Sequence, residues 1–107
     1  EFLYVDDMAS ACVHVMNINK KLYEHHVTTM ASHINVGFGS DITISDLARL
    51  VGSAVGFCGE IRFDETKPDG VAKKLLDSSK LKKMGWNARV SLEAGLKRTY
   101  QDFLTNN

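Results

Sequence analysis

The chain has 107 residues, which is enough for one small domain and too few for two. Hydrophobic residues make up 44% of the sequence, so it carries enough apolar side chains for a folded core and is unlike a disordered protein. Lys and Arg total 13, and Asp and Glu also total 13. This balance lacks the basic excess of nucleic-acid-binding and membrane-surface proteins, so we expect neither nucleic acid nor a membrane as partner.

The chain has two cysteines, Cys12 and Cys58, which are too few for a disulfide-stabilised scaffold. No further ligands follow Cys12 and His14 at the spacing of a metal site, so we expect no bound metal. We predict that both thiols are reduced and buried, in a cytoplasmic protein. No apolar run approaches the length of a membrane span.

The first predicted element is a short strand over residues 2–5, followed directly by Asp6 or Asp7 as the N-cap of a helix. Apolar residues at three- and four-residue spacing predict the buried face of this helix, which comprises Met8, Cys12, Val15, Ile18 and Leu22. Because the sequence opens inside a strand, we expect the chain to be a fragment of a longer protein.

A second strand is predicted over residues 32–36, closed by a glycine-rich turn. Thr43 and Asp46 then form the capping-box pattern at the start of a second helix, and Gly56 suits its C-terminal end. The predicted buried face of this helix comprises Ile44, Leu47, Ala48, Val51, Ala54 and Val55.

A third strand is predicted over residues 60–64, where apolar and charged residues alternate. Lys67-Pro68-Asp69-Gly70 has the composition of a type I turn. A brief helix from Asp77 or Ser78 to Met84 follows, and a last helix begins at Ser91 with Glu93 and Lys97 as an outward pair. The predicted buried face of the last helix comprises Leu92, Leu96, Tyr100, Phe103 and Leu104.

Strands that alternate with helices indicate an α/β fold with short parallel strands. Parallel sheets normally have both faces covered, and three strands make a poor independent sheet of that kind. The element order therefore also predicts a missing partner half.

Two patterns that could bind a cofactor or a metal are weak. Gly37-Phe38-Gly39 lies between a strand and a helix, but the third glycine of a dinucleotide-binding loop is replaced by Ile42. Glycines that shape a turn are the better interpretation. The four histidines (His14, His25, His26 and His33) show no metal-ligand spacing, so we assign them no function.

The segment from Lys67 to Lys74 is the strongest candidate for a binding site. Lys67, Lys73 and Lys74 could hold a diphosphate, and Asp69 could accept hydrogen bonds from sugar hydroxyls. From charge spacing alone, a solvated surface loop is the alternative.

Several separated segments resemble the extended short-chain dehydrogenase/reductase family of nucleotide-sugar enzymes. Within it, the turn Lys67-Pro68-Asp69-Gly70 followed by residues 73–77 is similar to the GDP-L-fucose synthase family, and so is the tail over residues 84–100. This resemblance implies that residues 1–107 are a C-terminal substrate-binding domain fragment, whose N-terminal NADP-binding Rossmann domain is absent.

The implied parent enzyme is a cytoplasmic homodimer that converts GDP-4-keto-6-deoxy-D-mannose to GDP-L-fucose by epimerisation and NADPH-dependent reduction. The family's catalytic and NADP(H)-binding residues lie upstream, so we expect no catalytic residue, no cofactor site and no activity in this chain. No Tyr-x-x-x-Lys pattern is present, because Tyr4, Tyr23 and Tyr100 are followed four residues later by Met8, Val27 and Leu104.

The resemblance also implies roles for the loop. Lys74 matches a lysine that reaches the GDP diphosphate, Asp69 matches a substrate-binding aspartate, and Lys67 is a weaker match. Two alternatives stay open: another nucleotide-sugar epimerase or dehydratase of the same superfamily, and a non-catalytic binding or oligomerisation module.

Overall fold

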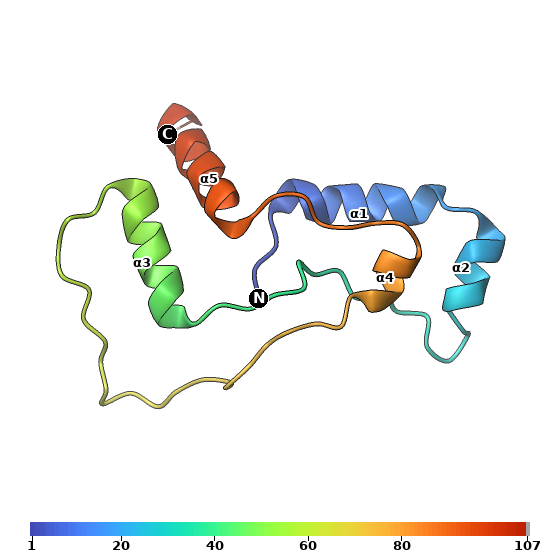
Figure 1. Cartoon of the computed structure of the whole chain (residues 1–107), viewed down its shortest axis with the longest axis horizontal. Coiled ribbons are helices and arrows are strands. Elements are labelled where there is room, and N and C mark those ends of the chain that lie inside the picture. The colour runs from blue at the N-terminus through green and yellow to red at the C-terminus, as the bar shows by residue number, and fades with distance from the viewer. Residues whose placement is uncertain (107) are drawn as a thin grey trace.

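Helices are the only regular elements in residues 1–106, the part of the chain that the computed structural model describes (Figure 1). They are α1 (Val5–Asn17), α2 (Lys20–His26), α3 (Ile44–Val55), α4 (Ser79–Lys83) and α5 (Leu92–Asn106). α1 and α2 lie at one end of the molecule, α3 and α5 pack against each other, and α4 lies below α1 (Figure 1). None of these helices is both long and apolar enough to cross a membrane.

The predicted parallel strands do not form within residues 1–106, so that part of the α/β prediction is wrong for this structure. Residues 32–36 and 60–64 are irregular, and one isolated antiparallel bridge joins Thr28 to Ala31. The physical reason is that a strand exists only through ladder hydrogen bonds to a neighbour. Within the described part of the chain, neither segment makes the backbone hydrogen bonds of a ladder.

A small core forms where α1 and α4 meet the segment that follows α4. Ala11 of α1 and Leu81 of α4 are completely buried, and the remaining buried apolar residues are Val27, Met84 and Trp86. Trp86 also donates a hydrogen bond from Nε1 to Ser10 Oγ, at 3.0 Å. The His14 ring donates from Nε2 to the carbonyl of Met84 at 2.9 Å, so polar contacts lock the same interface.

Asp7 ties α1 to a segment more than 80 residues away. Its Oδ2 accepts hydrogen bonds from the backbone amides of Arg89 at 3.0 Å and Val90 at 2.9 Å. The residue is only 4% exposed, so both bonds are shielded from water. The prediction that Asp6 or Asp7 is the N-cap is wrong: the N-cap position is Tyr4, which makes no side-chain capping bond.

The predicted buried stripe of the first helix is confirmed only in part, because Val15 and Ile18 are half-buried against the core and Leu22 is exposed. Met8 and Cys12 are exposed, whereas Asp7 and Ala11 are the buried residues of α1. The helix ends at Asn17, because Ile18 and Asn19 are extended and the Asn19 side chain accepts a bond from Lys21 N at 2.8 Å to start α2. Cys58 is exposed too, so the prediction of two buried cysteines fails, although both are free thiols.

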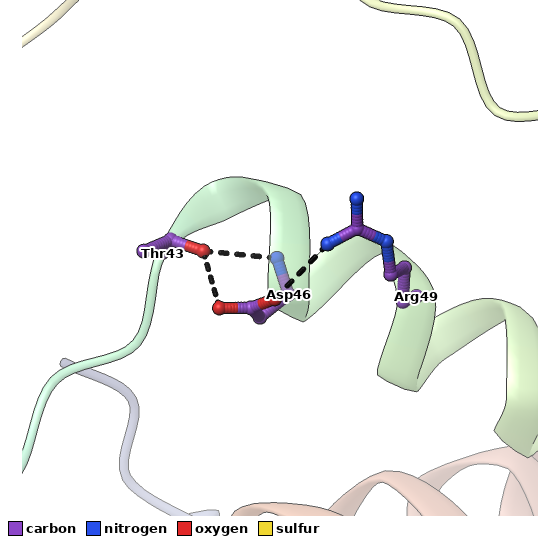
Figure 2. Close-up of polar contacts among 3 residues, drawn as sticks. All are labelled: Thr43, Asp46 and Arg49. Atoms are coloured by element: carbon purple, nitrogen blue, oxygen red, sulfur yellow. Dashed lines mark hydrogen bonds and ion pairs between the residues drawn. The ribbon is translucent and has the colours of Figure 1, made fainter.

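The predicted capping box at the start of α3 and the predicted glycine at its end are both confirmed. Thr43 is the N-cap, and its Oγ1 accepts from Asp46 N at 3.0 Å and donates to Asp46 Oδ2 at 2.7 Å (Figure 2). Arg49 continues this network with an ion pair to Asp46 Oδ1 at 3.1 Å (Figure 2). Gly56 ends the helix at φ 72°, in the left-handed region that glycine adopts without steric cost.

The later helices also begin and end near their predicted positions. α4 lies within the range predicted for the brief helix, and the Gly85 that follows has φ 95°. Before α5, Ser91 Oγ accepts from Ala94 N at 3.3 Å, and the predicted pair of Glu93 and Lys97 forms at 2.7 Å. Phe103 and Leu104 are exposed, so the predicted buried face of α5 is too long.

The apolar face of α3 is open rather than buried. Ile44 is 68% exposed, and Gly52 is the one buried residue of the helix. An open apolar groove of about 430 Å³ follows this face and is lined by Ile44, Leu47, Ala48, Val51, Gly52, Val55, Phe57 and Ile61. The radius of gyration is 17.4 Å, whereas a compact domain of this length has about 13 Å. The chain is therefore spread out around its small core.

Replacing Asp7 with Ala should destabilise the fold, because two shielded backbone amides would lose their acceptor. We expect the free energy of unfolding to fall by about 2–4 kcal/mol, measured by urea denaturation. Asp6→Ala is the matched control, since Asp6 is exposed in the same helical turn and should cost less than about 0.5 kcal/mol. Equal losses in the two variants would contradict this account of the core.

Candidate functional site

The predicted binding segment, residues 67–74, lies in a long irregular stretch between α3 and α4. This stretch runs along the outer edge of the molecule (Figure 1). Its turn is displaced from the prediction: Lys67 N donates to Asp64 O at 3.3 Å, so the turn spans residues 64–67. The Asp64 carboxylate favours this position, because it accepts bonds from Thr66 N at 3.0 Å and Thr66 Oγ1 at 2.6 Å.

Residues 69–74 form one wall of a hollow of about 570 Å³. The opposite side is residues 41–44 at the start of α3, together with Glu1 and Phe2. Asp69 and Lys74 both line this hollow, so the structure brings two of the three predicted site residues to one place. Lys67 is not part of the lining and lies in the turn that precedes it.

Of the two adjacent lysines that line the hollow, Lys73 forms an ion pair and Lys74 does not within residues 1–106. Lys73 Nζ lies 3.5 Å from Asp41 Oδ2, and their side chains are 64% and 40% exposed, so this ion pair is weak. Within the described part of the chain, the ammonium group of Lys74 makes no ion pair. Lys74 is therefore the lysine of this wall whose positive charge is available to an anion.

The segment that follows Lys74 is held in place by polar contacts. Asn35 Nδ2 donates to the carbonyl of Asp77 at 3.2 Å, and Asp77 Oδ1 accepts from Ser79 N at 2.9 Å at the start of α4. Hydrogen bonds from Ser79 lower the pKa of the Asp77 carboxyl below its usual 3.8, and nearby Lys83 and Lys82 add to this effect. These contacts fix one end of the loop that carries Lys74.

The patterns set aside in the sequence have structural roles. Gly39 has φ 93°, consistent with glycines that shape a turn. His14 belongs to the core interface described above, and the rings of His25 and His26 meet edge to face with centroids 4.9 Å apart. No group of three or more potential metal ligands gathers anywhere in residues 1–106.

Sequence reasoning missed two charged residues of the hollow, Glu1 and Asp41. Asp41 carried only a weak signal, as an exposed acid just before a helix cap. Glu1 carried none, because its contacts are with residues 38 and 75 positions away.

No protein-family model matches the chain. It is 50% identical over 106 residues to a GDP-L-fucose synthase of Escherichia coli. This match covers 99% of this chain and 33% of the relative. A GDP-L-fucose synthase of Arabidopsis thaliana is 46% identical over 106 residues, covering 99% of this chain and 30% of the relative. The chain thus spans about a third of the length of the curated relatives that it matches.

Solved structures show the same relationship. A GDP-6-OMe-4-keto-L-xylo-heptose reductase from C. jejuni is 35% identical, with a TM-score of 0.87 over 100% of this chain and 31% of its own. A GDP-D-glycero-L-gluco-heptose synthase from Campylobacter jejuni, crystallised in the presence of NADPH, is 32% identical with a TM-score of 0.83. That match covers 97% of this chain and 29% of the synthase.

The chain is thus similar over nearly its whole length to one segment of enzymes named as GDP-sugar reductases and synthases. Among them, it is a relative of the GDP-L-fucose synthases, matched over nearly its whole length. The resemblance inferred from the sequence is therefore confirmed.

The lowered pKa of Asp77 can be measured by NMR titration of its carboxyl group. The native midpoint should lie below 3.8 and should return to that value in urea, where the bonds from Ser79 are lost. Because the folded pKa is depressed, the stabilisation by Asp77 is present above the unfolded pKa and disappears as the pH falls through the folded pKa. A native midpoint at or above 3.8 would contradict this description of the start of α4.

Proposed function

We propose that this chain is the substrate-binding, C-terminal part of a GDP-L-fucose synthase. The complete enzyme would convert GDP-4-keto-6-deoxy-D-mannose to GDP-L-fucose by epimerisation beside the ketone and NADPH-dependent reduction. The observation that carries the proposal is the 50% identity to such a synthase over 106 residues. The hollow beside residues 69–74 is the place in this chain where the substrate would bind.

The chemistry of the hollow suits a nucleoside-diphosphate sugar. Its volume of about 570 Å³ lies in the usual range for small-molecule sites, which is roughly 300–1,000 Å³. The Lys74 ammonium, which makes no ion pair within residues 1–106, would bind the diphosphate as a mobile point charge. The Asp69 carboxylate would accept hydrogen bonds from hydroxyl groups of the sugar. Lys67, which lies outside the lining, would at most contribute a distant positive charge.

The chemical steps would take place on residues outside this chain. Proton removal beside a ketone needs a positioned base and acid, and the Tyr-x-x-x-Lys pair that the family uses is not found in the sequence. NADP(H) would be bound by an N-terminal Rossmann domain that precedes this segment. We therefore expect residues 1–107 to be inactive alone, and we keep the homodimer and the cytoplasmic location as predictions.

A different GDP-sugar enzyme is the second candidate. The observation in its favour is that a heptose reductase matches all of this chain with a TM-score of 0.87. Such an enzyme would use the same diphosphate contact and would differ in the sugar that it accepts. Turnover of GDP-4-keto-6-deoxy-D-mannose against the heptose substrate would separate the two candidates.

We also propose that the rest of the enzyme supplies sheet neighbours to residues 60–64. In support, Ile61 and Phe63 alternate with Arg62 as in a strand and remain exposed here. The amides of residues 60–64 should then exchange with deuterium slowly in the full-length protein and rapidly in residues 1–107 alone. Equally fast exchange in both proteins would contradict this proposal.

Lys74→Ala tests the proposed diphosphate contact in the full-length protein. GDP-fucose binding, measured by calorimetry, should weaken by about 1.5–3 kcal/mol, or roughly ten- to a hundredfold, because one charge-assisted contact is lost. NADPH binding should be unchanged. Lys83→Ala is the control, since Lys83 lies on α4 outside the hollow.

Unchanged GDP-fucose binding in Lys74→Ala would contradict the proposed site. An equal loss in Lys83→Ala would also contradict it, because the effect would then follow overall charge rather than the hollow.

A further inference from the structure

The carboxylate of Glu1 connects two segments that are distant in sequence. Its Oε1 accepts a hydrogen bond from Gly39 N at 2.6 Å, and its Oε2 accepts one from Leu76 N at 3.0 Å. One side chain therefore joins the glycine-rich turn before α3 to the segment before α4. Bonds to a charged acceptor are shorter and roughly twice as strong as neutral ones.

The glycine-rich turn is shaped around this carboxylate. A Cβ at the buried Gly37 would lie 2.6 Å from Glu1 Oε1, closer than real Cβ atoms approach other atoms. Gly39 has φ 93°, a conformation that residues with a Cβ rarely adopt, and it donates its amide to the same oxygen. This fit explains glycines that the cofactor-binding interpretation left without a role.

The bridged segment carries the proposed diphosphate ligand. Leu76 is two residues from Lys74, and Glu1 and Lys74 line the same hollow. On the other side of Lys74, the loop is held through the weak, exposed pair of Lys73 and Asp41. The carbonyl of Lys74 accepts a hydrogen bond from the Glu1 nitrogen at 3.0 Å. Together with the bond from Leu76 N to Glu1 Oε2, this contact fixes the path of the backbone across the hollow.

We propose that Glu1 is a positioning residue, which holds the backbone of residues 74–76 so that the Lys74 ammonium faces the bound diphosphate. The proposal rests on the proposed function of the hollow and names a residue that acts on the substrate through Lys74. Glu1 itself carries the same sign of charge as the diphosphate, so a direct contact with it would be unfavourable. With both oxygens bonded to amides, Glu1 serves the site through the backbone.

Glu1→Gln in the full-length protein tests this proposal. An amide side chain can accept only at its oxygen and carries no charge, so one bridge is lost and the other is weakened. We expect GDP-fucose binding to weaken by about three- to tenfold. KM for the GDP-sugar should rise with kcat unchanged, and the affinity for NADPH should be unaltered.

A double-mutant cycle with Lys74→Ala gives the decisive readout. If Glu1 acts through Lys74, Glu1→Gln should have no further effect on GDP-fucose binding in the Lys74→Ala background. Gly37→Ala should weaken binding like Glu1→Gln, because its Cβ displaces the carboxylate. Glu93→Gln is the matched control, since Glu93 is exposed on α5, pairs with Lys97 there and lies outside the hollow, so binding should be unchanged.

The outcomes separate this inference from the proposed function. If Lys74→Ala weakens binding while Glu1→Gln does not, or if the two effects add, Glu1 is not a positioning residue and the substrate site stands. If Lys74→Ala itself has no effect, the proposed site fails. Loss of NADPH binding in Glu1→Gln and Gly37→Ala would assign Glu1 to general stability and would also overturn the inference.

Discussion

The paired hydrogen bonds of Asp7 are the interaction on which the rest of this structure depends. They hold the segment around Arg89 and Val90 against α1, so that Trp86 and Met84 can cover Ala11. The core contains few buried residues, and burial alone gives limited stability to so small a cluster. The shielded Asp7 carboxylate, which accepts hydrogen bonds from two amides, therefore specifies which face of α1 the segment after α4 covers.

The same device recurs beside the proposed substrate site. Glu1, like Asp7, accepts hydrogen bonds from two backbone amides that are distant in the sequence. Glu1 precedes α1, and Asp7 lies in its first turn. The N-terminal residues thus act as anchors for two later segments, one leading into α4 and one into α5. This arrangement places the loop of Lys74 against the start of α3, although no strand supports that loop in residues 1–106.

Features that depend on neighbouring residues could be predicted from the sequence. The Thr43 cap, the end of α3 at Gly56 and the position of α4 follow from contacts within a few residues. Features that depend on distant partners could not. Asp7 has the pattern of a cap, but its acceptor role is decided by amides 82 and 83 positions away. The strands failed for the same reason, because a strand needs ladder hydrogen bonds to a distant segment, and none form within residues 1–106. Asp69 and Lys74 were singled out from the composition of residues 67–74, the family resemblance added specific roles for them, and these roles stay predictions.

A crystal structure of the full-length protein with GDP-fucose tests the central claim most directly. The account predicts the diphosphate within hydrogen-bonding distance of Lys74 Nζ, with the sugar beside Asp69 and the Glu1 carboxylate still bonded to the amides of Gly39 and Leu76. A nucleotide bound elsewhere, with Lys74 and Asp69 facing solvent, would contradict the claim that this segment holds the substrate.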